Sequence, residues 1–114
     1  MEYARISIQL LASDMGRRTP FCPQGRKQKS FYMPHFRVGG VGEFLGVAFV
    51  DGPEQIAPGG SGECEVVLMY EGVDYSLLRP GASFDIVEGP KTIGSGVVLR
   101  RWKTEAAWNG VSSA

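Results

Sequence analysis

The chain has 114 residues, 43% of them hydrophobic and 21% charged, and its formal net charge is zero. This length supports one domain with one core and excludes two. No run approaches the roughly 18 apolar residues of a membrane span, and charges interrupt the apolar N-terminal pattern, so we expect a cytoplasmic protein without a signal peptide. Cys22 and Cys64 are too few for a disulfide scaffold and form no CxxC pair, so they signal neither a metal nor a redox centre.

The first half of the chain predicts three strands. Residues 4–10 alternate between apolar and polar side chains, which is typical of a half-buried strand. A long basic loop follows, and residues 30–38 form a second strand in which Pro34 indicates an edge or a bulge. Residues 43–50 are apolar on both sides, which indicates a third strand that is well covered.

Three further strands are predicted at residues 62–70, 83–88 and 92–102. In the last of them, Gly94 and Gly96 permit bending or a close backbone approach. No segment keeps a helical period. The pattern therefore predicts an all-β domain over residues 1–103 and a C-terminal tail over 104–114, and it leaves open whether the strands form a barrel or a sandwich.

The zero net charge hides a segregation of charge along the chain. Residues 15–42 contain six basic residues and no acidic one, whereas residues 43–88 contain nine acidic residues and one basic one. Such asymmetry predicts either separate surfaces that steer a charged partner or pairing between the two segments.

Two segments carry a resemblance to a known family. Gly16-Arg17-Arg18-Thr19-Pro20-Phe21, followed by Phe31-Tyr32 and Arg37, resembles the start of the third, C-terminal domain of elongation factor Tu. The segment from Glu88-Gly89-Pro90-Lys91 to Val98 resembles that domain's Glu-Gly-Gly-Arg-Thr-Val-Gly-Ala-Gly-Val-Val stretch. The resemblance implies a six-stranded antiparallel Greek-key β-barrel. It also implies no GTP binding, because the factor's GTPase is a separate domain and this sequence has no GxxxxGK[ST] loop.

The resemblance further implies a binding surface, since this domain of the factor helps to hold the T-stem of aminoacyl-tRNA. The residues it suggests for a partner or for RNA are Arg17, Arg18, Thr19, Glu88, Gly89 and Lys91, and the basic residues Arg26 and Lys27 extend the set. Arginine forks suit phosphate oxygens, and glycine backbone admits a ribose closely. The alternative is that Thr19, Pro20 and Phe21 simply anchor a loop whose arginines are solvated.

Several departures from the family weaken tRNA binding in particular. Arg18 replaces a histidine of the family, and Glu63 and Glu65 lie where the family carries a lysine for the tRNA backbone. An acid that faces phosphate opposes binding. The resemblance therefore supports the fold more strongly than the ligand.

These observations favour a non-catalytic binding module with no cofactor and no metal. His35 is the only histidine and has no evident nucleophile or orienting acid, so an enzyme is the least favoured class. The leading hypothesis is an unidentified protein partner, with the chain acting as a decoy, immunity or regulatory protein. The alternative is an RNA- or tRNA-binding module that uses the basic loop. The oligomeric state stays open, including a pair formed through the Pro34 edge.

Overall fold

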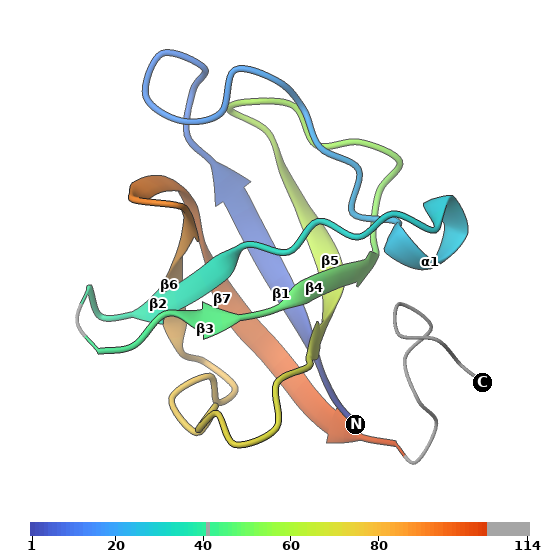
Figure 1. Ribbon diagram of the computed structural model, residues 1–114. Coiled ribbons are helices and arrows are strands. Elements are labelled where there is room, and N and C mark those ends of the chain that lie inside the picture. Colours follow the sequence, from blue (N-terminus) through green and yellow to red (C-terminus); the bar gives the residue numbers. More distant parts are fainter. Residues whose placement is uncertain (41, 105–114) are drawn as a thin grey trace.

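The computed structural model describes residues 1–40 and 42–104. Its elements, in chain order, are β1 (Glu2–Leu10), α1 (Gly25–Gln28), β2 (His35–Val38), β3 (Leu45–Gly46), β4 (Ala48–Asp51), β5 (Ser61–Leu68), β6 (Ser83–Glu88) and β7 (Lys91–Lys103). The strands form one sheet in the order β3-β2-β6-β7-β1-β5-β4, with every pair antiparallel. The sheet curls into a half-barrel (Figure 1). The predicted all-β class is confirmed.

The core lies on the concave face of the sheet, where the predicted alternation of β1 places its apolar side chains. Ile6, Ile8 and Leu10 are buried, whereas Ser7 and Gln9 between them are exposed. Aromatic rings from other strands meet them in one core cluster, and the rings of Phe36 and Phe84 stack with centroids 4.1 Å apart. Burial of such side chains is the main stabilising contribution to the fold, because each removes a large apolar area from water.

The expected third strand is interrupted at Val47, so that it forms β3 and β4. The two halves pair on opposite sides: β3 pairs with β2, and β4 pairs with β5. A segment whose two halves pair with different strands of a curled sheet must bend between the halves. The alternation of apolar and polar side chains in the sequence does not reveal such a bend. The described chain therefore has seven strands.

The expected second strand also starts later than predicted, at His35 rather than at residue 30. Two backbone hydrogen bonds nevertheless join residues 32–34 to residues 47–49: Phe49 N donates to Tyr32 O at 2.9 Å, and Val47 N donates to Pro34 O at 3.2 Å. Pro34, which has no N–H to donate, lies just before β2, and β2 is flanked by β3 and β6, so the edge predicted here is not found.

The glycines predicted to allow close backbone approach on β7 do so. An added Cβ at Gly94 would lie 2.6 Å from the carbonyl oxygen of Gln9, and one at Gly96 would lie 2.7 Å from that of Ser7. Both contacts are with β1, the strand that pairs with this part of β7. Glycine at these positions lets two neighbouring strands coil closely around the core.

The two ends of the described domain are joined to each other. Met1 and Thr104 exchange two backbone hydrogen bonds, the nitrogen of each donating to the oxygen of the other, at 2.7 and 2.9 Å. The predicted tail beyond this pair, residues 105–114, lies outside the described residues. In the part of the chain that the structure describes, no helix is both long enough and apolar enough to cross a membrane.

The two cysteines differ in environment, which leads to a prediction about their reactivity. Cys64 is buried on β5, and burial raises the pKa of its thiol to about 12, whereas Cys22 is half-buried in the loop before α1. Because the thiolate is the reactive form, a thiol reagent at neutral pH should modify Cys22 and spare Cys64 in the folded protein. Denaturant should then expose a second thiol. Rapid native labelling of the Cys22→Ser variant would contradict this expectation.

Candidate binding surface

The loop after β1 and the turn between β6 and β7 lie together. Arg17 forms an ion pair with Glu88, and the Tyr32 hydroxyl donates a hydrogen bond to the same carboxylate. The Arg17 guanidinium lies over the rings of Tyr32 and Phe21, 5.0 and 5.6 Å from their centroids, and its Nε donates to the carbonyl of Thr19 at 3.1 Å. We call Arg17, Thr19, Phe21, Tyr32 and Glu88 the Arg17 cluster.

The electrostatics of this cluster keep Arg17 charged and Tyr32 neutral. Burial lowers the pKa of Arg17, but its hydrogen bond and ion pair with Glu88 outweigh burial, so that its pKa is raised overall. Burial raises the pKa of Tyr32 well above its ordinary value, and the neighbouring Glu88 carboxylate raises it further. The side chains of Arg17 and Glu88 are only 18% and 32% exposed. The Arg17 guanidinium is therefore paired with the Glu88 carboxylate of the same molecule.

Two predictions about this loop can be compared directly with the structure. Phe21 is buried and forms a β-bridge with Ile56, so the predicted anchoring of the loop is confirmed for Phe21, whereas Thr19 and Pro20 are exposed. The prediction that the arginines are solvated is wrong for Arg17 and right for Arg18, which is exposed. Thr19 is exposed and is held through its carbonyl by Arg17.

The turn from β6 to β7 contributes the other residues suggested by the resemblance. Lys91 Nζ donates to the carbonyl of Gly16 at 2.9 Å, so this lysine ties the turn to the loop. Gly89 is exposed and has a φ of 56°, a conformation that glycine adopts without steric penalty. The amino group of Lys91, like the guanidinium of Arg17, is therefore already engaged within the molecule.

Arg26 and Lys27 belong to a separate group on α1, a short helix that sequence analysis did not predict. Arg26 Nη1 bonds Glu65 Oε2 at 3.0 Å, and its guanidinium lies 5.2 Å from the centroid of the Tyr3 ring. Lys27 is exposed. Figure 1 shows α1 on the opposite side of the molecule from the β6–β7 turn. The predicted binding residues thus fall into two groups rather than one surface.

Ion pairs connect the basic segment, residues 15–42, with the acidic segment, residues 43–88. Arg17 with Glu88 and Arg26 with Glu65 both join the basic segment to the acidic one, and Glu63 is paired with Arg5 at 3.2 Å. Of the two outcomes expected for the segregation, pairing within the chain is confirmed for these residues. No protein-family model matches the chain.

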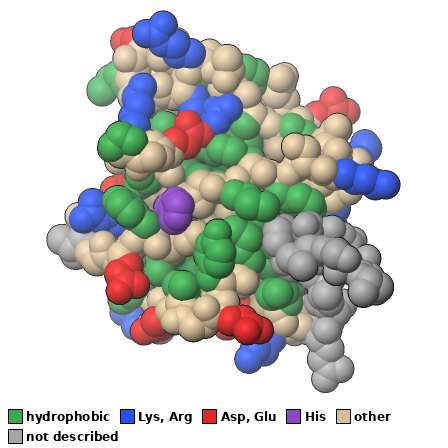
Figure 2. Space-filling model, in the orientation of Figure 1, with side chains coloured by type: hydrophobic (Ala, Val, Ile, Leu, Met, Phe, Trp, Pro, Cys, Tyr) green, Lys and Arg blue, Asp and Glu red, His purple; other side chains and the backbone are tan. Residues whose placement is uncertain are grey.

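An exposed apolar surface that the sequence pattern did not predict lies beside Pro34. Residues 43–50 were expected to be well covered, but Phe44 is 50% exposed, and its ring centroid lies 6.1 Å from that of the exposed His35. Met33 and Tyr70 are also about half exposed. Figure 2 shows the single histidine, His35, with green side chains to its left and to its lower right on this side of the molecule. We call Met33, His35, Phe44 and Tyr70 the β2–β3 face.

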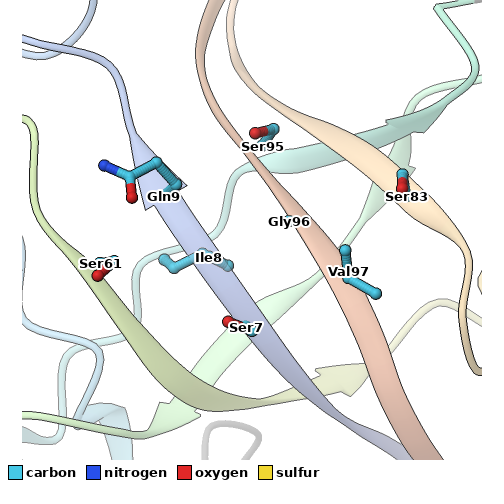
Figure 3. A pocket seen from close by; sticks show the side chains of 8 residues that line it. All are labelled: Ser7, Ile8, Gln9, Ser61, Ser83, Ser95, Gly96 and Val97. Carbon is cyan, nitrogen blue, oxygen red and sulfur yellow. The ribbon is translucent and has the colours of Figure 1, made fainter.

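A shallow hollow of about 410 Å³ lies on the outer side of the sheet, over β5, β1, β7 and β6 (Figure 3). Two cross-strand rows line it, and each is formed by register partners: Ser61, Gln9 and Ser95 in one, Ser7, Val97 and Ser83 in the other. Four of these six residues are serines, which have short side chains. Its lining offers hydroxyl groups and one amide but no charged group.

Metal-ligating side chains and the surroundings of His35 can be examined for sites of metal binding or catalysis. Within residues 1–40 and 42–104, no group of three or more His, Cys, Asp or Glu side chains could hold a metal ion. His35 is exposed, and its ring lies 6.1 Å from that of Phe44. This neighbour is a packing partner and supplies neither a nucleophile nor an acid for catalysis.

Proposed function

We propose that this chain is a non-catalytic binding module that engages a protein partner through a six-stranded Greek-key barrel like the C-terminal domain of elongation factor Tu. The partner would be one that recognises that domain, so that the chain competes with the factor as a decoy, immunity or regulatory protein. The two matching segments in the sequence motivate this proposal, and the arrangement of strands and charges supports it.

The strand arrangement supports the barrel. If β3 and β4 are counted as one interrupted strand, the strands number six, and the hydrogen bonds of residues 32–34 to residues 47–49 link the two ends of the sheet. β2, β3/β4 and β5 are then consecutive neighbours, while β6 returns through a long connection to lie beside β2. That order is the one that defines a Greek key.

The observation that carries the choice of a protein partner is the internal use of the basic groups. Arg17 bonds Glu88, Arg26 bonds Glu65, and Lys91 bonds the Gly16 carbonyl. Phosphate contacts supply most of the affinity of a protein for nucleic acid, so groups engaged in this way contribute little to it. An exposed aromatic surface, in contrast, is typical of a protein contact.

A competition experiment tests the proposal. The chain is immobilised, captures partners from a cell extract, and is then challenged with an excess of the isolated C-terminal domain of elongation factor Tu. We expect the free domain to displace at least one captured protein, and purified partner and chain to bind directly. Retention of no protein above background, or of proteins that the free domain never displaces, would overturn the proposal.

RNA binding is the second candidate, and the exposed basic residues favour it. Arg18, Lys27 and Lys29 are exposed, and none forms an ion pair within the described residues. If they hold phosphates, tRNA or single-stranded RNA should bind at about 50 mM salt and weaken steeply as salt rises. The variant Arg18→Ser/Lys27→Ser should then reduce the salt slope. Absence of binding at low salt would exclude this candidate.

A further inference from the structure

Arg37 differs from the other half-buried arginines of the described chain. Arg5, Arg17 and Arg101 each bond a carboxylate. Arg37 bonds none: its Nε is buried without a hydrogen-bond partner, and its guanidinium lies over the Phe44 ring, 5.2 Å from the centroid. Asp85 is its cross-strand neighbour on β6, but the two side chains form no ion pair. The half-buried guanidinium of Arg37 thus carries a charge that no carboxylate of the described chain neutralises, and an incoming carboxylate could bond its accessible N–H groups.

The strand register places Arg37 at one end of the β2–β3 face. Its side chain contacts Phe44, just beyond the last paired residues of the β2–β3 hairpin. Two residues back along β2, His35 pairs with Gly46, and the ring of Tyr70 lies directly against Gly46. Along this face, therefore, Arg37 and Phe44 form one end, and Tyr70 forms the other.

The Tyr70 end carries an acid that is also unpaired. Glu71 follows Tyr70 directly, is exposed, and forms no ion pair among the described residues. Tyr70 itself is oriented by its backbone nitrogen, which donates to the Tyr75 hydroxyl at 3.2 Å, while that hydroxyl donates to the Gly46 carbonyl at 2.6 Å. The face thus has an unpaired cation at one end, exposed rings in the middle, and an unpaired anion at the other end.

We propose that two copies of this chain associate through the β2–β3 face around a two-fold axis. A two-fold axis reverses the order of the face in the second copy, so that Arg37 of each copy meets Glu71 of the other. The dimer then contains two Arg37–Glu71 ion pairs, and the Phe44 and Tyr70 rings pack across the contact. A partner that carried only one sign of charge could pair with Arg37 or with Glu71 but not with both. A second copy of the chain carries both charges and can pair with each.

The size of the face sets the expected strength of the pair. Standard protein interfaces bury about 800 Å² on each partner, and the few large side chains of this face offer less. Aromatic and arginine side chains nevertheless dominate binding energy where they are buried together. We therefore expect a reversible dimer with a dissociation constant in the micromolar range or weaker.

Sedimentation equilibrium of the full chain, from about 5 μM to about 1 mM, tests the proposal. We expect a concentration-dependent dimer that Arg37→Glu and Glu71→Arg each weaken at least about tenfold, because each single change places like charges together twice. The double variant Arg37→Glu/Glu71→Arg should restore association, since the swap recreates both pairs. Lys29→Glu, which changes an exposed charge outside this face, should leave the dimer unchanged.

Two outcomes would overturn the dimer. One is a chain that stays monomeric at the highest concentration. The other is a double variant that associates no better than the single ones, which would show that Arg37 and Glu71 do not meet. Phe44→Ser, in an exposed position, should weaken the dimer without unfolding the monomer, and a circular dichroism spectrum checks the fold of every variant. Neither outcome depends on the partner proposed above, so the two proposals can fail separately.

Discussion

Replacement of Gly96 by alanine is expected to lower the free energy of unfolding by about 2–3 kcal/mol, the upper part of the range for an overpacked site. An added Cβ would lie 2.6 Å from Cζ of Phe84 and 2.7 Å from the backbone oxygen of Ser7. The ring of Phe84 is buried against Phe36, and the Ser7 backbone is held in β1 between β5 and β7. Neither neighbour can move without a loss of core packing or of strand pairing.

The neighbouring Ser95 offers a matched control. It is exposed and lies on the same strand, so Ser95→Ala should change the free energy of unfolding by less than about 0.5 kcal/mol. Chemical denaturation of both variants, with equal slopes required for a valid comparison, measures the difference. A Gly96→Ala protein as stable as the parent would show that β1 and β7 can separate at this point, contrary to the close approach described above.

The local pattern of the sequence was sufficient to predict most strands. In β1 the alternation of Ile6, Ser7 and Ile8 marks both the strand and its buried face, and glycine in a strand marks the close approach at Gly96. The division at Val47 could not be predicted in this way, because it depends on which neighbour each half of the segment pairs with. That choice is a property of the curled sheet and not of the local residues.

The candidate site shows the same limit. The resemblance suggested Arg17 and Glu88 as residues that hold an external ligand, whereas the two side chains bond each other across 71 residues of chain. The exposure of Phe44 could not be predicted, because Phe44 lies in a segment that is apolar on both sides. Such a segment does not indicate which of its two sides the rest of the protein covers. Long-range pairing and coverage both depend on tertiary structure.

Replacement of Glu88 by alanine is expected to lower the free energy of unfolding by about 2 kcal/mol. Loss of one member of a fully buried ion pair costs about 3–5 kcal/mol, and we reduce this figure because Glu88 is 32% exposed and water can reach Arg17 in part. The change also removes the acceptor of the Tyr32 hydroxyl. Glu88→Gln, which keeps an acceptor oxygen but loses the charge, should show a smaller loss.

A double-mutant cycle separates the ion pair from the rest of the cluster. Arg17→Met keeps the apolar stem over Phe21 and Tyr32 while it removes the charge. In the background of Glu88→Ala, this second change should cost less than in the parent, because the carboxylate is already gone. Additive effects of the two changes would mean that the observed ion pair contributes nothing to stability.

The pH dependence of stability gives a readout that is specific to this cluster. The pKa of Tyr32 is raised in the folded protein, so the unfolded chain loses the Tyr32 proton at a lower pH than the folded protein does. The contribution of Tyr32 to stability is therefore fully present below the ordinary tyrosine pKa of about 10, and it is lost as the pH rises above that value. Glu88 is the second cause of that shift after burial, so Glu88→Ala should lower the pKa of Tyr32 and reduce the loss of stability at high pH. Tyr32→Phe should remove the contribution of this side chain altogether. If the alkaline loss were the same in all three proteins, the contact between Tyr32 and Glu88 would have no part in it, and Arg17 alone would hold the carboxylate between the loop and the turn.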